Sequence, residues 1–457
     1  MINNKQTHIL RQPLNGGLML ATIILLVWQT AGIRHLQAHV PHSITELTSA
    51  QPMTGTIPTI PSGPSTVYLP LVTRMPPPAY RIGFGATNGP ITRYLDIQTL
   101  QAGWYTDWGV TLQPPRPSGI EYMQMVRVHQ KLACGEWHNA DRLACPYARP
   151  LDYVFTPDIA TIQAVAHANP GSLWAIGNEM DASDFDGCVE YDVDNRCIRS
   201  MALGQDEMTP ETYARAYHEL YQVIKTLDPT ARIAIGGLIQ ATPSSLAWLT
   251  TAWNSYRKRY DATMPVDVWN IHNFILTEAT GRASPRMAID ASAQASGDEG
   301  PTADWAHINQ QLFDSQIRAM RQWMKARGQQ HKPLIISEYG VLYWHCVKKN
   351  SENVCIQDLN NEQVVQEFMT WTFDYFLNTK DCDLGYADDE CRLVQRWLWF
   401  SLDHVSSLPD GRLSYGANSH ASLYNSTTLE MRATGLKFRH YVQDHYADLA
   451  QLPGQSP

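Results

Sequence analysis

Eight short apolar runs alternate with longer amphipathic stretches from about residue 80 to the C-terminal region. This alternation of strand-like and helix-like segments indicates an α/β protein, and eight repeats of it predict a (β/α)8 TIM barrel. An open doubly wound sheet is the alternative, but no Gly-x-Gly-x-x-Gly follows the first run. The expected strands are 81–86, 103–108, 121–130, 173–181, 232–240, 266–274, 334–343 and 396–403.

Helix signals lie between these runs. Thr209 followed by Pro210 predicts an N-cap and a first helical residue, and the helix should continue to about Leu227. Apolar side chains at helical spacing predict a helix with one buried face over 361–377, and 430–446 is expected to form the last helix. Since a barrel typically takes about 250 residues, the remaining length predicts enlarged loops.

The N-terminal region differs in amino-acid composition from the rest of the chain. Lys5 and Arg11 precede an uncharged stretch at 16–33, so residues 1–38 are expected to be a signal peptide or a signal anchor. That stretch is just long enough to span a bilayer, and residues 16–33 could therefore tether the chain to a membrane. Residues 39–78 are rich in Pro, Ser and Thr and are expected to be a linker. The barrel domain is then 79–450.

The eight cysteines form four neighbouring pairs, whose members are 11, 9, 9 and 9 positions apart. This clustering favours sequential disulfides, each stabilising a short loop by about 2–3 kcal/mol. Metal ligation is the alternative, but structural zinc usually takes Cys-x2-4-Cys spacings. Disulfides indicate an oxidising compartment, so we expect an extracellular or cell-surface protein. The expected bonds are Cys134–Cys145, Cys188–Cys197, Cys346–Cys355 and Cys382–Cys391.

The charge balance narrows the function further. The chain carries 35 Lys and Arg against 44 Asp and Glu, a net charge of −9, without a long basic run. Nucleic-acid binding needs clustered positive charge and is not expected. The sequence shows no phosphate-binding glycine loop and no histidine spacing typical of metal ligation, so neither a cofactor nor a metal is expected. We take a monomer as the expected oligomeric state.

Two of the expected strands end in a glutamate. The fourth ends in Asn178-Glu179 and the seventh in Ser337-Glu338. Either glutamate alone could be an ordinary strand-end carboxylate. However, the C-terminal strand ends of a barrel form its active face, and strands four and seven lie nearly across its mouth. Two facing carboxylates suit glycoside hydrolysis, in which one protonates the leaving oxygen and the other attacks the anomeric carbon.

These motifs resemble the catalytic signatures of the retaining clan A glycoside hydrolases, as does Trp-Leu-Trp-Phe at 397–400. The stretch 103–108 resembles the Trp-Tyr-x-x-Trp segment of glycoside hydrolase family 128, the Asl1-like glycosyl hydrolases, many of which are β-1,3-glucanases. The resemblance covers residues 80–446. It implies that Glu179 is the general acid/base, that Glu338 is the nucleophile, and that Asn178 hydrogen-bonds the sugar 2-hydroxyl.

His272 matches the His-x-aromatic position of the clan at the end of strand six. The aromatic residue there is commonly a Tyr that holds the nucleophile, but here it is Phe274, which has no hydroxyl. We expect Tyr339 or His272 to compensate. Family 128 typically has Asn-Glu-Pro-Asp after strand four, and this chain has Asn-Glu-Met-Asp, which keeps Asp181.

Aromatic and basic residues near the strand ends are candidates for substrate binding. Trp399 is expected to be a stacking platform for the sugar, because aromatic faces pack on the C–H faces of pyranose rings. Trp104 and Trp108 could line the cleft or pack in the core. Arg127 and His129 alternate with apolar residues on strand three, which suggests either substrate contact or a satisfied buried pair.

The sequence therefore predicts an extracytoplasmic retaining glycoside hydrolase that cleaves β-glycosidic bonds of a polysaccharide or glycan, with β-glucan as one candidate. Three of the four expected disulfides fasten loops on the catalytic face, and 275–304 is the best candidate for a mobile lid. The alternatives are a carbohydrate-binding barrel without catalysis and a surface adhesion protein.

Overall fold

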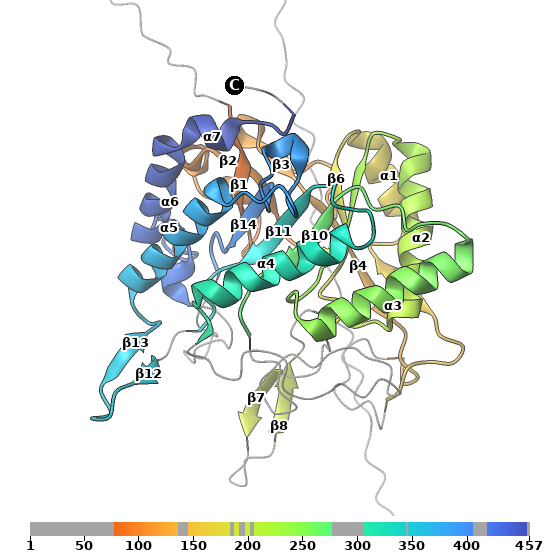
Figure 1. Cartoon of the computed structure of the whole chain (residues 1–457), viewed down its shortest axis with the longest axis horizontal. Helices are drawn as coiled ribbons and strands as arrows, with labels where there is room; N and C mark the ends of the chain where they lie inside the picture. The colour runs from red at the N-terminus through yellow and green to blue at the C-terminus, as the bar shows by residue number, and fades with distance from the viewer. Residues whose placement is uncertain are drawn as a thin grey trace, which may run out of the picture. The chain divides into compact units, whose positions relative to one another are not determined.

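The computed structural model describes residues 77–135, 145–182, 205–276, 306–343, 346–404 and 418–454, together with the backbone at 187–191 and 197–201 (Figure 1). The predicted signal or anchor segment, nearly all of the predicted linker, and 277–304 of the predicted lid lie outside the described residues. Among the residues described, no helix is long and apolar enough to cross a bilayer.

The predicted (β/α)8 barrel is confirmed. Each barrel strand pairs in parallel with its neighbour, and the last strand returns to pair with the first. Isolated bridges from Ala234 to Val268 and from Leu238 to Ile271 join the fifth strand to the sixth. In chain order the strands are β1 (Ala79–Gly85), β2 (Ala102–Thr106), β3 (Glu121–Tyr122) continued by β4 (Gln124–Gln130), β6 (Leu173–Asn178), β9 (Arg232–Gly237), β10 (Trp269–His272), β11 (Leu334–Tyr339) and β14 (Arg396–Phe400).

Helices cover the outside of the barrel (Figure 1). The predicted helix after Thr209 is confirmed as α2, with Thr209 at the N-cap in an extended conformation and Pro210 in the first turn. The last predicted helix begins at Ala433, three residues later than expected. The helices are α1 (Ile159–Ala168), α2 (Pro210–Leu227), α3 (Pro243–Tyr260), α4 (Gln310–Lys325), α5 (Glu362–Asn378), α6 (Ala433–Asp444) and α7 (Tyr446–Ala450).

Short elements decorate the connections. β5 (Tyr153–Thr156) pairs antiparallel with β4. Two antiparallel hairpins follow the strands that carry the predicted catalytic glutamates: β7 (Gly187–Tyr191) with β8 (Cys197–Met201), and β12 (Cys346–Lys349) with β13 (Cys355–Asp358). Single 3-10 turns are η1 (Ile91–Arg93), η2 (Ile97–Leu100), η3 (Pro117–Gly119), η5 (Ala387–Asp389) and η6 (Ser419–Ala421).

Three of the four predicted disulfides are present. Cys134–Cys145, Cys346–Cys355 and Cys382–Cys391 have Cα–Cα distances of 5.4, 5.9 and 4.7 Å. The predicted bond between Cys188 and Cys197 falls on side chains outside the described part of the chain. The disulfides favour an oxidising, extracytoplasmic setting.

The apolar core has two layers, because successive residues of a strand point to opposite faces. Trp397 and Trp399 of β14 pack in the outer layer, between the barrel and its helices. Leu398 lies between them in the sequence and belongs instead to a smaller inner cluster. That inner cluster, which fills the barrel, consists of Trp104, Met123, Met125, Leu173, Ala175, Ala234, Val268, Ile335 and Leu398.

Candidate active site

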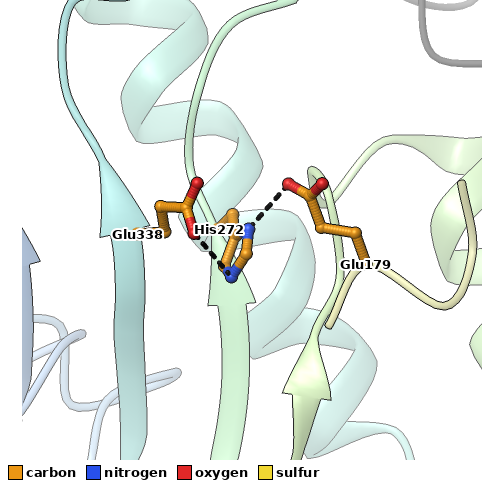
Figure 2. Close-up of side chains that lie close together, drawn as sticks. All are labelled: Glu179, His272 and Glu338. Atoms are coloured by element: carbon orange, nitrogen blue, oxygen red, sulfur yellow. Dashed lines mark hydrogen bonds and ion pairs between the residues drawn. The ribbon is translucent and has the colours of Figure 1, made fainter. Parts of the chain in front are cut away.

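Glu179, His272 and Glu338 meet at the C-terminal ends of β6, β10 and β11. Figure 2 shows the imidazole between the two carboxylates, with one ring nitrogen facing each glutamate. Nδ1 of His272 lies 2.8 Å from Oε1 of Glu179, and Nε2 lies 3.8 Å from Oε2 of Glu338. One carboxylate oxygen of each glutamate and one His272 nitrogen all lie within 4.8 Å of one another. The structure thus brings together three residues singled out from the sequence.

The backbone turns sharply where Glu179 leaves β6. Gly177 and Glu179 both have positive φ angles, of 89° and 49°. For a glutamate this conformation is sparsely populated and stores roughly 1–3 kcal/mol of strain. A hydrogen bond from Glu179 N–H to the Gly237 carbonyl, 2.9 Å long, holds the turn against the end of β9. The turn directs the Glu179 carboxylate toward His272.

Gly237 also makes room for the imidazole. A Cβ on Gly237 would come within 2.3 Å of the His272 ring, closer than real Cβ contacts. Glycine at the end of β9 therefore lets His272 lie between the two glutamates.

Trp108 supplies a hydrogen bond to Glu338 that Phe274 cannot make. Its indole Nε1 donates to Oε2 of Glu338 at 2.9 Å. The ring packs on Gly85, where a Cβ would come 2.6 Å from it, and meets Phe400 edge-on at 5.7 Å between centroids. Of the two residues expected to compensate for Phe274, His272 faces Glu338 and Tyr339 does not. Tyr339 is fully buried in the helix-facing layer, so of the two residues His272 is the one that lies beside Glu338.

Burial dominates the electrostatics of Glu338, whose side chain is only 13% exposed. Removal from water, assisted by the Glu179 charge, raises the pKa of Glu338 to about 7, against the opposing influence of His272, Trp108 and Arg127. Burial also opposes a charge on His272, but the carboxylates of Glu338 and Glu179 outweigh it and raise the pKa of this imidazole. The protonation of Glu338 and that of His272 therefore depend on one another.

Replacing Trp108 with phenylalanine tests how far its hydrogen bond offsets the effect of burial on the pKa of Glu338. The substitution removes an N–H donor that favours the ionised carboxylate, so the pKa of Glu338 should rise further. If ionised Glu338 is the reactive form, kcat/KM near pH 6.5 should fall by about 10–100-fold, the size of a hydrogen bond to a charged group. The acidic limb of the pH–rate profile should move to higher pH, and the deficit should shrink in alkaline solution.

Trp323→Phe is the matched control, because its indole donates to Thr250 in the outer layer, at 3.0 Å. An unshifted acidic limb in Trp108→Phe, or an equal shift in both variants, would contradict the assigned role of Trp108.

Glu179 has a second partner, which the sequence did not reveal. Nε2 of Gln205 donates to Oε2 of Glu179 at 2.9 Å, while His272 faces the other oxygen. Gln205 belongs to the buried segment 205–209, which directly precedes α2. The available signal was an acidic-amide stretch just before a helix N-cap, and that pattern alone does not indicate contact with a strand end.

Asn178, Arg127 and His129 gather around Asp206. The Asn178 N–H and the Arg127 Nε both donate to the Asp206 carboxylate, at 2.9 and 2.8 Å. Nε2 of His129 lies 3.4 Å from it. Arg127 and His129 therefore match the alternative of groups satisfied by a partner, with His129 buried and Arg127 partly exposed. Arg127 nevertheless lies near enough to lower the pKa of Glu338.

Two of the tryptophans singled out from the sequence lie outside the cleft. Trp399 is fully buried between Tyr339 and Phe373, and its Nε1 donates to the Ala421 carbonyl. The predicted stacking role of Trp399 was wrong, because alternation along β14 turns it toward the helices. The next residue, Phe400, is partly exposed and lies beside Trp108 and Phe274.

Trp104 likewise fills the interior of the barrel. It is fully buried, and its Nε1 donates to the Arg81 carbonyl at 3.2 Å. Of the two roles considered from the sequence, Trp104 packs in the core. Trp108, four residues later, contacts the predicted catalytic carboxylate of Glu338.

Asp181 is a second buried carboxyl beside Glu179. Its Oδ1 accepts the Ile239 N–H at 3.1 Å, and the Ser245 side chain also donates to it. Burial nevertheless raises the pKa of Asp181 to about 7. A raised folded-state pKa means that this group favours folding most below its unfolded pKa of about 4, and that this contribution is lost as pH rises through 7.

Asp181→Asn should therefore stabilise the protein at pH 8, by on the order of a few kcal/mol, and change little at pH 4–5. Urea unfolding at both pH values measures the difference. Asp228→Asn is the control of opposite sign: hydrogen bonds from Thr230 and Gly171 outweigh burial and lower the pKa of Asp228. Asp228→Asn should reduce stability at pH 8 and matter less as the pH falls toward 3. A destabilised Asp181→Asn at pH 8 would contradict the expected cost of this buried charge.

The three central side chains offer one nitrogen and two oxygen ligands at short range. However, Glu179 faces Nδ1 of His272 and Glu338 faces Nε2 (Figure 2). A single ion bound through one imidazole nitrogen could reach both carboxylates only if one glutamate moved. The arrangement is better suited to moving protons than to holding a metal.

These features define a (β/α)8 barrel with a pair of carboxylates at the C-terminal ends of its strands. No protein-family model matches the chain, and no curated protein matches it. Solved structures do match. A subgroup II family 128 endo-β-1,3-glucanase from Sorangium cellulosum is 12% identical, with a TM-score of 0.39, over 79% of this chain and 97% of its own.

Two further matches belong to the same family. A subgroup I endo-β-1,3-glucanase from Amycolatopsis mediterranei, in complex with laminaritriose, is 15% identical, with a TM-score of 0.38, over 79% of this chain and 99% of its own. A subgroup VII oligosaccharide-binding protein from Trichoderma gamsii is 12% identical, with a TM-score of 0.39, over 81% of this chain and 96% of its own. The structural matches thus include family 128 and other glycoside hydrolases, and the similarity concerns the fold.

Proposed function

We propose that this protein is an extracytoplasmic retaining glycoside hydrolase that cleaves β-glycosidic bonds of a polysaccharide or glycan. The observation that supports this most is the spacing of the two carboxylates, whose nearest oxygens lie within 4.8 Å across the barrel mouth. Retaining enzymes hold this pair about 5–5.5 Å apart, whereas inverting enzymes leave about 6.5–9.5 Å for a water molecule.

In the first step Glu338 attacks the anomeric carbon while protonated Glu179 gives its proton to the departing glycosidic oxygen. A bond forms between the anomeric carbon and the Glu338 carboxylate, and the bond to the leaving group breaks. Only ionised Glu338 can attack. The Trp108 N–H donor and the nearby His272 favour that form against the effect of burial.

In the second step ionised Glu179 takes a proton from water, and the water oxygen attacks the anomeric carbon and releases Glu338. Glu179 thus alternates between protonated and ionised forms. His272 can serve both, since imidazole accepts a hydrogen bond through an unprotonated Nδ1 and donates one through a protonated Nδ1. Gln205 holds the second oxygen of Glu179 in the same place.

The apolar side chains beside Glu338 fit a neutral sugar. Phe400, Tyr343 and Leu342 are partly exposed and pack around the buried Phe274 at the ends of β14, β11 and β10. Such side chains can pack on the C–H faces of pyranose rings. We therefore take a β-glucan as the first substrate class to test. On this proposal residues 1–38 export or tether the protein, and 39–78 link that segment to the catalytic domain.

The test is a panel of β-1,3-, β-1,4- and mixed-linked glucans incubated with the full chain, with release of reducing ends as the measurement. Glu338→Ala and Glu179→Gln serve as controls. Proton NMR of the first product formed should show the β-anomer, because retention follows from two inversions. Binding without turnover, unaffected by either substitution, would instead favour the carbohydrate-binding barrel.

A further inference from the structure

A buried five-residue segment, 205–209, crosses the ends of β4 and β6 beside the candidate acid. Its members bond to residues on or next to those strands. The Met208 N–H donates to the Met180 carbonyl at 3.0 Å, and the Thr209 N–H donates to Oε1 of Gln130 at 2.8 Å. Gln205 at the start of the segment reaches the Glu179 carboxylate.

Asp206 in this segment holds the two strands together beyond their paired region. Parallel pairing of β4 with β6 runs from Gln124–Trp174 to Val126–Ile176. Two residues further along, the Val128 and Asn178 N–H groups both donate to Oδ2 of Asp206, at 3.0 and 2.9 Å. The carboxylate therefore takes the place of a backbone partner for each strand.

The Asn178 residue is held on both sides by Asp206. The Asp206 backbone N–H donates to the Asn178 carbonyl at 2.8 Å, and its carboxylate accepts the Asn178 N–H. The next residue is Glu179, at the strained turn that directs its carboxylate toward His272. Neighbouring residues of the segment thus hold neighbouring residues of the strand end: Asp206 fixes the backbone and Gln205 contacts the carboxylate.

The charge on Asp206 is part of the arrangement. Its side chain is fully buried, and Oδ1 faces Nε and Nη2 of Arg127 at 2.8 and 2.6 Å. His129 lies on the same strand at 3.4 Å from the carboxylate, and Tyr213 of α2, whose pKa is raised mainly by burial, is near enough for the Asp206 charge to add to that rise in pKa. An ionised carboxylate can accept from all the N–H groups around it. An amide would turn an N–H group toward other N–H donors.

We propose that Asp206 is a positioning residue for the acid step: by holding Asn178 it sets the place from which Glu179 protonates the leaving group. This inference rests on the function proposed above. Asp206 touches neither the sugar nor the reacting atoms, so its effect should depend on how much the substrate needs the acid.

Aryl β-laminaribiosides that differ in leaving group make this dependence measurable. A phenyl leaving group needs a proton, whereas 2,4-dinitrophenolate leaves without one. In Asp206→Asn, kcat/KM for the phenyl substrate should fall by about 10²–10³-fold, within the usual worth of general acid catalysis. The value for the dinitrophenyl substrate should fall by less than about 10-fold. An equal fall in kcat/KM for the two substrates would mean that Asp206 has only a structural role, and would overturn the proposal.

Asp389→Asn is the matched control. Asp389 is also a buried carboxylate paired with an arginine of a barrel strand, Arg81, but it lies at the opposite, N-terminal end of the strands. Replacing Asp389 should lower kcat/KM for the phenyl and the dinitrophenyl substrate by the same small factor. Because Asp206→Asn leaves the Arg127 charge uncompensated, the double variant Asp206→Asn/Arg127→Gln is measured alongside and should show the same dependence on leaving group.

Crystal structures separate this inference from the proposed function. If the wild-type protein hydrolyses neither aryl substrate, or if Glu338→Ala retains full activity, the proposed function fails. The positioning claim is still decided by geometry. The contacts of Glu179 with His272 and Gln205 should be lost or lengthened in Asp206→Asn and kept in Asp389→Asn. Unchanged contacts in Asp206→Asn would overturn it.

Discussion

Glu338→Ala should lower kcat by a factor of about 10⁴ or more, because on the proposed mechanism it removes the group that bonds to the anomeric carbon. The fold should persist, since the side chain lies at the mouth of the barrel and is partly exposed. Release of dinitrophenol from an aryl β-glycoside measures the loss. Added sodium azide should restore turnover through the vacated space and give the α-glycosyl azide, the product of a single inversion.

The control is Glu352→Ala, an exposed glutamate between β12 and β13. It should leave kcat unchanged. Residual activity of Glu338→Ala above a few per cent, or a β-glycosyl azide as its rescue product, would contradict the nucleophile assignment.

Glu179→Ala should impair the two steps unequally. With a phenyl leaving group kcat/KM should fall by about 10²–10⁴-fold, the usual contribution of general acid catalysis. A dinitrophenyl leaving group needs no proton, so its first step should be nearly unaffected. Hydrolysis of the glycosyl enzyme would then limit turnover, because no base activates the water.

Stopped-flow measurement should therefore show a burst of dinitrophenolate followed by slow turnover. Azide should accelerate the slow phase and give the β-glycosyl azide, the opposite anomer to that from Glu338→Ala. If kcat/KM fell equally for the phenyl and the dinitrophenyl substrate, without a burst, the acid/base assignment would be contradicted.

The barrel and its central residues could be predicted from the sequence because strand order determines where the strand ends lie. Glu179 and Glu338 each follow an apolar run, and a closed eight-stranded barrel brings the ends of runs four and seven together. His272 was placed through its match to the His-x-aromatic position of the clan at the end of strand six. No contact had to be known in advance.

Gln205, Asp206 and the role of Trp108 depended on long-range contacts. Asp206 reaches Asn178 across 28 positions, and Trp108 reaches Glu338 across 230. No spacing rule connects such residues, since the loops between them fix the geometry. For Asp206 the sequence showed only that it lies shortly before Thr209, the N-cap of α2.

The placement of Trp399 failed for a different reason. Both faces of a barrel strand are buried, so alternation of apolar and polar residues does not say which face looks inward. Trp397, Trp399 and Phe400 are all apolar, and only packing assigns the first two to the helix side.

Two positions without side chains matter to this site as much as its glutamates do. Any Cβ at Gly85 would push the Trp108 indole from its place, and any Cβ at Gly237 would collide with His272. Neither glycine takes part in the chemistry itself. A search for distant relatives that keep this catalytic arrangement should nevertheless require glycine at both positions. A relative with alanine at either one would be expected to hold its nucleophile or its acid by other means.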